Sequence, residues 1–365
     1  MPEISSSPDA RHEAPSQTHA RKAARAQRTL RTPGDLLESG LIDRDALADV
    51  TRVSQRYATA IPDVFRALIE HPDDPIGLQV IPHADELILS PDEDADPIAD
   101  DALSPVPGIV RRYADRALLK PLLVCPLYCR FCFRREHVGP DGGLLGDDDL
   151  DRALGWLSDH AEIREVILTG GDPLMLSPRR LSTIMARLNA IPHVTTIRIH
   201  SRVPLAAPER VSGELLDALE TDRALWLALH ANHAREFTQA GDAALRTIIR
   251  RGIPVLGQSV LLRGVNDSSA ALEDLFRAMV ERRVKPYYLH QLDRAPGTAR
   301  FHVPIEEGRA LLASLRGRVT GLAWPTYVLD IPGGHGKAPL GPDYVDLDSG
   351  MIIDPSGQTH ALGAA

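Results

Sequence analysis

The chain of 365 residues is 43% hydrophobic and 25% charged, values typical of a globular protein with room for one large domain or two smaller ones. Its formal net charge of −9 argues against general binding to nucleic acid, which needs a basic face. No apolar run approaches the length of a membrane span, so we expect no membrane partner.

Residues 1–31 differ in composition from the rest. They are rich in Ser, Ala, Arg and His and have neither a periodic apolar face nor the apolar core of a secretory signal. Glu3, Asp9 and Glu13 disfavour an organelle transit peptide, so we expect a disordered or weakly helical arm. Since three cysteines cluster further along and no secretion signal is evident, the predicted location is the reducing cytoplasm.

Residues 32–106 are predicted to form a helical N-terminal region. Between residues 33 and 57, apolar side chains recur at spacings of three and four, which is the pattern of amphipathic helices. A proline-containing acidic run, SPDEDADPIADD at residues 90–101, then indicates a linker or loop.

From residue 107, short apolar runs alternate with amphipathic helical stretches, which predicts parallel strands joined by crossover helices. Six or seven such units favour a full or partial (β/α) barrel over a flat doubly wound sheet. The predicted strands span residues 118–124, 165–169, 196–200, 225–230, 254–261, 286–289 and 327–331. Polar motifs follow these strands, as expected for a barrel whose chemistry lies on loops at the C-terminal ends of its strands.

The three cysteines of the chain, Cys125, Cys129 and Cys132, follow the first of these strands in the stretch CPLYCRFCFRR. Three thiolates spaced C-x3-C-x2-C can hold three irons of a 4Fe-4S cluster and leave the fourth iron open to a substrate or cofactor. Phe131 would shield such a cluster from water. The alternative is a Cys3His zinc site with His137, in a binding protein without redox chemistry. It is disfavoured because zinc sites usually combine two separated ligand pairs.

Two glycine-containing motifs follow other predicted strands. Gly170, Gly171 and Asp172 belong to GGDP, where an open backbone would let a ligand approach closely, although GG followed by Asp is also an ordinary turn. Lys337 lies in DIPGGHGKAPL, at residues 330–340, after the last strand. A lysine is usually a solvated surface charge, but one in a glycine-rich loop at a barrel mouth can form a Schiff base with an aldehyde cofactor.

These motifs resemble those of a known family. CPLYCRFC resembles the signature of the radical S-adenosylmethionine enzymes, and GGDP one strand later resembles their second motif. The wider resemblance is to the lysine 2,3-aminomutases and covers roughly residues 55–345, through SPVPGIVRRYADRALL, CRFCFRR, LTGGDPL, IRIHSRVP, LALHANH, GQSVLLRGVND and PYYLHQLD. It implies a partial (β/α)6-type TIM barrel of the radical S-adenosylmethionine class at residues 107–345, with the helical extension before it and a short tail at residues 346–365.

The resemblance implies three cofactors: a 4Fe-4S cluster, S-adenosylmethionine and pyridoxal 5′-phosphate. The three cysteines would hold the cluster, and the residues near S-adenosylmethionine would be Gly170, Gly171, Asp172, His230 and Gln258. Lys337 would carry pyridoxal phosphate as the catalytic residue, and the residues around that cofactor would be Arg112, Tyr113, Arg116 and Ser201. Arginine suits phosphate because its fork donates two parallel hydrogen bonds. The ordinary alternatives are a surface ion pair with Asp115 for the arginines and a backbone-bonded buried imidazole for His230.

The substrate implied is a basic amino acid. Arg134, two residues past the last cysteine, resembles the residue that binds the substrate carboxylate, and Asp293 and Asp330 resemble the pair that binds a distal ammonium. Two carboxylates in one pocket repel each other unless a cation lies between them, which favours lysine. The implied enzyme is an isomerase that moves the 2-amino group of L-lysine to C3, giving β-lysine. The alternatives are arginine or ornithine as the substrate, and β-lysine supply for the modification of elongation factor P.

The resemblance also implies a reducing electron donor such as flavodoxin or ferredoxin, and a homo-oligomer. Because all three cysteines are assigned to the cluster, we expect no structural zinc.

Overall fold

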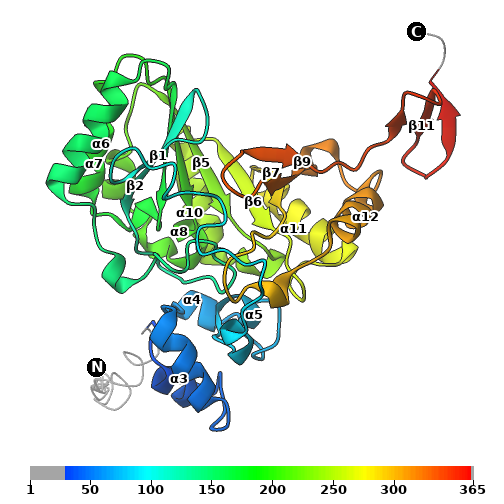
Figure 1. The fold of residues 1–365 in the computed structure, drawn as a ribbon, viewed down its shortest axis with the longest axis horizontal. Coiled ribbons are helices and arrows are strands. Elements are labelled where there is room, and N and C mark those ends of the chain that lie inside the picture. The colour runs from blue at the N-terminus through cyan, green and yellow to red at the C-terminus, as the bar shows by residue number, and fades with distance from the viewer. Residues whose placement is uncertain (1–28, 363–365) are drawn as a thin grey trace, which may run out of the picture.

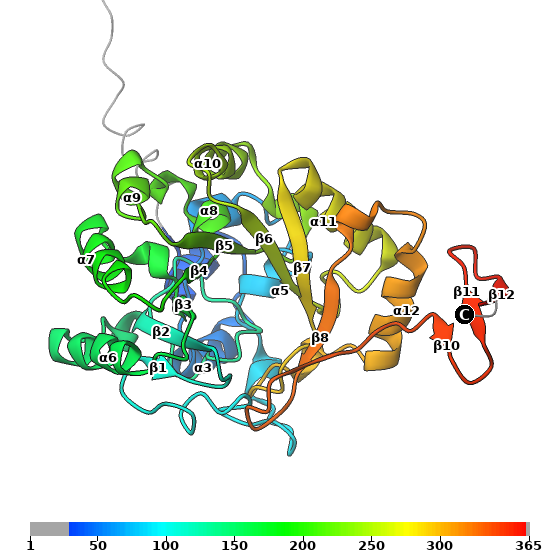
Figure 2. The same cartoon turned by 90° about the horizontal axis from the view of Figure 1, so that it is seen from above.

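The computed structural model describes residues 29–362, so the arm predicted at residues 1–31 lies almost entirely outside the described residues. In this part of the chain nine strands form one sheet, in the order β1-β2-β3-β4-β5-β6-β7-β8-β9 (Figures 1 and 2). Strands β2 to β8 run parallel, whereas β1 and β9 pair antiparallel at the two edges. Since β1 and β9 lie at opposite ends of this order, the sheet is an open barrel, and the predicted partial barrel is confirmed.

Helices cross over between successive parallel strands. The strands are β1 (Ile109–Val110), β2 (Arg116–Leu122), β3 (Glu165–Gly170), β4 (Thr196–Ser201), β5 (Ala224–His230), β6 (Val255–Val260), β7 (Val284–His290), β8 (Thr326–Asp330) and β9 (Lys337–Pro339). The crossover helices are α6 (Asp147–Asp159), α7 (Pro178–Asn189), α8 (Val203–Ala206), α9 (Gly213–Asp217), α10 (Gln239–Arg250), α11 (Ser269–Glu281) and α12 (Ile305–Leu315). All seven predicted strands are present, because strands covered on both faces are rich in apolar residues.

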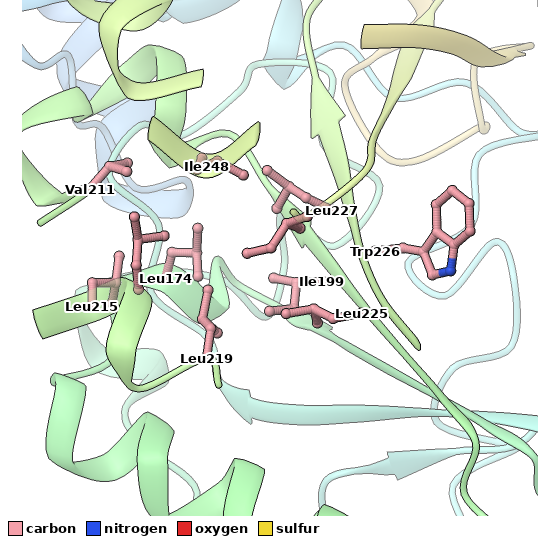
Figure 3. Close-up of a pocket in the computed structure, with 11 residues that line it drawn as sticks. Leu174, Ile199, Val211, Leu215, Leu219, Leu225, Trp226, Leu227 and Ile248 are labelled. Atoms are coloured by element: carbon pink, nitrogen blue, oxygen red, sulfur yellow. The ribbon is translucent and has the colours of Figure 1, made fainter. Parts of the chain in front are cut away.

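The main core lies between the sheet and these helices. Figure 3 shows a gap in it between β4, β5, α9 and α10, where Ile199, Leu215 and Ile248 contribute to the lining. Its lining consists of aliphatic side chains and Trp226. The gap offers no convergent polar groups for chemistry and belongs to the packing of helices on the sheet.

The N-terminal region is helical, as the sequence pattern predicts, but its helices are short. They are α2 (Pro33–Glu38), α3 (Leu47–Arg56), α4 (Asp63–Arg66), α5 (Gly77–Val80) and the 3-10 helix η1 (Ala84–Leu87). The side chain of Thr32 caps α2 by accepting a hydrogen bond from the backbone N–H of Asp35. The apolar core of this region includes Leu127 and Ala206, so these helices pack on the cysteine-bearing loop and on α8.

The acidic run at residues 90–101, predicted as a linker or loop, contains no regular helix or strand. It nevertheless reaches the interior, because Asp100 is only 5% exposed.

The predicted tail, residues 346–365, also contains regular structure that its sequence pattern does not indicate. There β10 (Val345–Asp346), β11 (Met351–Ile353) and β12 (Thr359–Ala361) form a separate antiparallel sheet that stands apart from the barrel (Figures 1 and 2). None of the helices described is long and apolar enough to cross a lipid bilayer.

Candidate active site

The loop after β2 carries three partly buried thiols that are not joined in disulfides. Burial raises the pKa of Cys125 well above its usual value and that of Cys132 to about 11. Burial also raises the pKa of Cys129, but the charge and hydrogen bond of Arg202 oppose this, since Arg202 Nη1 donates to Cys129 Sγ at 2.8 Å. The donor set is three reduced thiols on one loop beside a buried cation. It fits a cluster that takes one thiolate at each of three irons.

His137 does not complete a zinc site with these cysteines. Its Nε2 lies 3.8 Å from Asp101 Oδ2, and its side chain is 43% exposed. Among residues 29–362, no three His, Cys, Asp or Glu side chains converge on one metal position. A cubane cluster needs no such convergence because each cysteine binds a different iron.

The GGDP motif lies against the end of β2, which gives its glycines a role in backbone packing. A Cβ on Gly171 would lie 2.4 Å from the carbonyl oxygen and 2.5 Å from the nitrogen of Val124. Gly170 has φ +105° and would meet the Leu122 carbonyl oxygen at 2.7 Å. Backbone packing between β2 and β3 therefore requires both glycines before any ligand is considered.

Replacing Gly171 with alanine is accordingly expected to destabilise the protein by about 2–3 kcal/mol, because backbone atoms must shift to admit the methyl group. Gly155 is the matched control: it lies on the exposed face of α6, and a Cβ there has no atom within 4 Å. Alanine at Gly155 should stabilise by about 1 kcal/mol through helix propensity. Chemical denaturation of the two variants measures both values. Equal stability of Gly171→Ala and the natural chain would contradict the packing explanation.

Asp172, predicted near S-adenosylmethionine, organises two strand ends. Its buried carboxylate accepts hydrogen bonds from Ser201 Oγ at 2.8 Å and from the backbone N–H groups of Arg202, Val203 and Leu174. Burial raises the pKa of Asp172, and these donors oppose the increase. Ser201, predicted in the pyridoxal-phosphate pocket, therefore donates to Asp172 here and links the end of β4 to the loop after β3.

His230 and Gln258 are register partners on β5 and β6. The ring of His230 stacks on Phe131 with centroids 5.7 Å apart, so the predicted shielding residue and a predicted S-adenosylmethionine neighbour are in contact. The Nε2 atoms of His230 and His200 are buried and have no hydrogen-bond partner among the described residues. Burial lowers the pKa of both imidazoles well below the usual value, so both are neutral. Unpartnered buried nitrogens of this kind fit a polar ligand inside the barrel.

Lys337 and Asp330 face each other in the antiparallel β8–β9 pair. Lys337 Nζ lies 2.5 and 2.6 Å from the two carboxylate oxygens of Asp330. Arg112 Nη1 and His290 Nδ1 each lie 3.5 Å from the same carboxylate. Burial opposes ionisation of Asp330, but the hydrogen bond with His290 and the charge of Lys337 outweigh it and hold the pKa well below the usual range.

Asp293 lies close enough to Asp330 for the two charges to interact. Burial first, and then the charge of Asp330, raise the pKa of Asp293 to about 7, while Lys337, Arg112 and Arg134 oppose the increase. The carboxylates of Asp293 and Asp330 are thus close enough to act on one ligand group.

Arg134 and Arg112 converge on a carboxylate that the sequence reading did not identify. Arg134 Nε donates to Asp100 Oδ2 at 2.6 Å, and Arg112 Nη2 donates to Asp100 Oδ1 at 2.9 Å. Burial disfavours the charge of Asp100, but Arg134, Lys120 and Arg112 outweigh it and lower the pKa. No hydrogen bond within the described residues occupies Nη1 or Nη2 of Arg134. The signal for Asp100 was weak, because its acidic run contains four other aspartates that read as a solvated loop.

Tyr113 and Arg116 lie beside the lysine loop. The hydroxyl of Tyr113 accepts a hydrogen bond of 2.9 Å from the backbone N–H of Lys337. The guanidinium of Arg116 lies over the Tyr113 ring, 3.7 Å from its centroid, and its Nη1 pairs with Asp115 at 3.0 Å. In this structure Arg116 therefore makes the ion pair with Asp115 that was the alternative to phosphate binding. Arg112 instead points to the buried carboxylates of Asp100 and Asp330.

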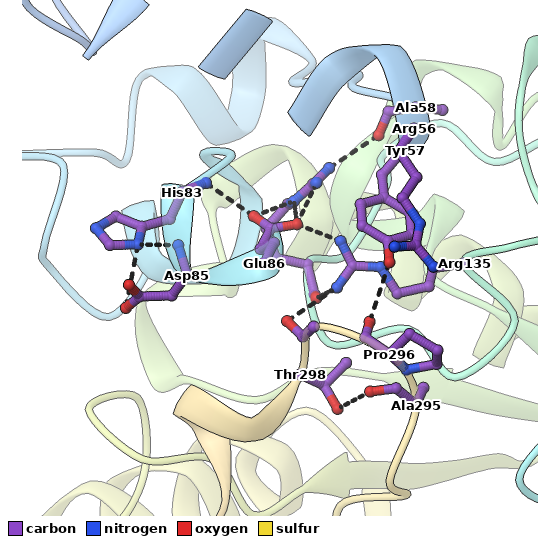
Figure 4. A network of polar contacts seen from close by, with 12 residues as sticks. Arg56, Tyr57, Ala58, His83, Asp85, Glu86, Arg135, Ala295, Pro296 and Thr298 are labelled. Atoms are coloured by element: carbon purple, nitrogen blue, oxygen red, sulfur yellow. Dashed lines mark hydrogen bonds and ion pairs between the residues drawn. The ribbon is translucent and has the colours of Figure 1, made fainter. Parts of the chain in front are cut away.

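Glu86 is a second buried carboxylate that sequence reading missed (Figure 4). It accepts hydrogen bonds from Arg130 Nε at 3.0 and 3.1 Å and pairs with Arg135, both from the cysteine-bearing loop. Arg135 Nη1 also donates to the Gly297 carbonyl, in the loop that follows Asp293. Burial opposes the charge of Glu86, but Arg130 and Arg135 outweigh it and lower the pKa. These contacts connect the N-terminal region to the cysteine-bearing loop and, through Arg135, to the loop that follows Asp293.

Comparison with known proteins identifies the family. Residues 119–276 match the model described as the Radical SAM superfamily, and residues 312–350 match the model described as Lysine-2,3-aminomutase. The chain is 39% identical over 298 residues to the L-lysine 2,3-aminomutase of Fusobacterium nucleatum, covering 81% of this chain and 70% of the relative. It is also 39% identical over 288 residues to that of Clostridium subterminale, covering 78% and 69%. The chain belongs to the lysine 2,3-aminomutase family.

Membership of the lysine 2,3-aminomutase family confirms the predicted resemblance and makes the chain an isomerase. Its radical S-adenosylmethionine domain implies a 4Fe-4S cluster, S-adenosylmethionine and an electron donor, and its family implies an amino acid as the small-molecule substrate. The family includes more than one substrate specificity: a relative from Clostridioides difficile named glutamate 2,3-aminomutase is 33% identical, covering 81% of this chain and 70% of the relative. The substrate must therefore be argued from the site.

Proposed function

We propose that this chain converts L-lysine to β-lysine, with pyridoxal 5′-phosphate held by Lys337. The observation that carries the proposal is the division of charge at the barrel mouth. The carboxylates of Asp293 and Asp330 interact there with each other, and Asp293 also interacts with the guanidinium of Arg134. An amino acid with a carboxylate at one end and an ammonium at the other fits this division.

The acidic end suits a primary ammonium. In this structure the ammonium of Lys337 itself lies against both oxygens of Asp330. A substrate ammonium between Asp330 and Asp293 would relieve the repulsion that raises the pKa of Asp293. The side chain of glutamate would instead bring a third negative charge, which supports lysine over glutamate.

The basic end suits the α-carboxylate. Asp100 fixes Arg134 through Nε, so the two terminal nitrogens can present a planar fork to a carboxylate. Arg134 lies two residues after Cys132, which would keep the α-carbon and C3 of the substrate beside the cluster loop. The substrate would span from this loop to the β8–β9 hairpin.

The cofactors would enter between these two ends. Attached through Lys337, pyridoxal phosphate supplies electronic stabilisation for a nitrogen that moves between adjacent carbons. The cluster and S-adenosylmethionine, when bound, supply the radical that removes hydrogen from the substrate. In this proposal Arg112, Tyr113 and Arg116 would bind the phosphate and orient the ring, which is supported by the hydrogen bond from the Lys337 N–H to the Tyr113 hydroxyl. Engagement of Lys337 by its cofactor would also withdraw its ammonium from Asp330 and free that carboxylate for substrate.

The deciding experiment is an anaerobic assay of protein reconstituted with iron, sulfide and pyridoxal phosphate and supplied with S-adenosylmethionine and a reductant. L-Lysine is expected to give β-lysine with a higher kcat/KM than L-ornithine, L-arginine or L-glutamate, and L-glutamate should be the poorest substrate because its side chain adds a negative charge to the acidic end. Products are identified by chromatography and mass spectrometry. Unchanged lysine from a preparation with full iron and cofactor would contradict the proposal, and faster turnover of ornithine or arginine would assign the acidic pair to a different basic amino acid.

A further inference from the structure

A buried arginine contacts one of the three cysteines and not the other two. Arg202 Nη1 donates to Cys129 Sγ at 2.8 Å, and the arginine side chain is only 7% exposed. No side chain among the described residues donates a comparable hydrogen bond to the sulfur of Cys125 or Cys132. The three sulfurs therefore have unequal surroundings.

Partners from three other parts of the chain fix this arginine. Its Nη2 donates to Gln79 Oε1 at 2.7 Å and to Glu236 Oε2 at 2.8 Å. Gln79 lies in α5 of the N-terminal region, and Glu236 ends the 3-10 helix η5 (Ala234–Glu236) after β5. The backbone N–H of Arg202 donates to Asp172 at 2.7 Å. These hydrogen bonds hold the guanidinium in one orientation, in which Nη1 points at the sulfur of Cys129.

The net effect of this network at Cys129 is that of a positive charge. Glu236 is bound at Nη2, the guanidinium nitrogen that does not contact the sulfur. Glu236 thus compensates for burial of the arginine without cancelling its influence on the sulfur.

We propose that Arg202 is a positioning residue that raises the reduction potential of the 4Fe-4S cluster through its charged hydrogen bond to Cys129. One-electron reduction takes the cluster from the 2+ to the 1+ state and adds one negative charge to its iron, sulfide and thiolate atoms. A cation and an N–H donor at a ligating sulfur stabilise the more negative state, so reduction becomes easier. The inference rests on the radical S-adenosylmethionine domain and needs neither lysine nor pyridoxal phosphate.

The test is a potentiometric titration of reconstituted, full-length Arg202→Gln and Arg202→Lys, followed by electron paramagnetic resonance of the 1+ cluster. Dithionite is the one-electron reductant, and no amino acid or S-adenosylmethionine is added. Arg202→Gln is expected to shift the midpoint to a more negative potential than that of the natural chain, with iron and sulfide content unchanged. Arg202→Lys keeps the positive charge but not the planar guanidinium, so its midpoint potential should lie between those of Arg202→Gln and the natural chain.

Arg235→Gln is the matched control. Arg235 also ties the loop after β5 to the N-terminal region, through Asp74 at 3.0 Å and Glu70 at 3.1 Å, but it does not contact a cysteine. The cluster of Arg235→Gln should have the same midpoint potential as the cluster of the natural chain. Equal potentials in Arg202→Gln and the natural chain, or an equal shift in Arg235→Gln, overturn the proposal. If Arg202→Gln fails to retain its cluster, Arg202→Lys decides: a negative shift supports the proposal and no shift overturns it.

Discussion

Replacing Lys337 with alanine is expected to abolish pyridoxal-phosphate binding and to lower turnover by at least on the order of a thousandfold, because it removes the amine that would attach the cofactor. The visible absorption of the bound cofactor should disappear. Iron and sulfide content should stay at the level of the natural chain, since Lys337 lies on β9 and the cysteines lie on the loop after β2. Absorption spectra and iron analysis of the same preparation measure both.

Lys285→Ala provides the control for this prediction. Lys285 Nζ donates to the carbonyls of Pro286 and Trp324, both at 2.8 Å, and takes no part in the candidate site. Its variant should keep both the visible absorption and the turnover of the natural chain. Persistence of the absorption in Lys337→Ala would show that the cofactor is attached elsewhere.

Asp330→Asn is expected to lower kcat/KM for lysine roughly 30- to 5,000-fold. This corresponds to a loss of about 2–5 kcal/mol of transition-state stabilisation, which is the usual cost of removing one partner of a buried charge pair. The amide keeps the shape of the side chain but cannot balance a substrate ammonium. Steady-state kinetics under anaerobic conditions measure the loss. Absorption of bound pyridoxal phosphate in the same preparation establishes that the cofactor site is still loaded.

The pH profile distinguishes recognition of charge from a structural role for Asp330. Burial and the charge of Asp330 raise the pKa of Asp293 to about 7, and binding of an ammonium requires the ionised form of Asp293. In the natural chain kcat/KM should therefore fall as pH decreases through about 7. Asp330→Asn removes the repulsion between the two carboxylates, so the acidic limb of the pH profile should move to lower pH. Asp330→Glu keeps the charge and should keep the limb in place. An unshifted limb in Asp330→Asn would contradict the assignment.

The barrel was predictable because its parallel strands are buried on both faces. The run predicted at residues 165–169 corresponds to β3 (Glu165–Gly170), and the run at 196–200 corresponds to β4 (Thr196–Ser201). Burial of such strands depends on their own apolar residues, which a sequence displays directly. The edge strands β1 and β9 were not predicted, since each has only two or three residues and is defined by pairing with a distant partner.

Of the candidate site, the sequence pointed to the residues that we propose carry the chemistry but not to those that hold them in place. The cysteines and Lys337 lie in motifs whose composition is unusual for a loop. Asp100, Glu86 and Arg202 are ordinary charged residues in their local sequence. Their roles arise from partners that lie 34, 44 and 73 positions away, at Arg134, Arg130 and Cys129, and only the fold brings these pairs together.

The pairing of Asp330 with Lys337 across the β8–β9 hairpin has a consequence for the proposed recognition of the substrate. Backbone hydrogen bonds set this register, and the Ile331 N–H donates to the Gly336 carbonyl at 2.8 Å to close the turn. Side chains alternate between the two faces of a strand, so a slip of one residue would turn Lys337 away from Asp330. In the proposed function, the hairpin would therefore set the distance between Lys337, which would attach the cofactor, and Asp330, which would bind the far end of the amino acid. Inserting one residue between positions 331 and 336 would change that distance without altering any side chain of the site.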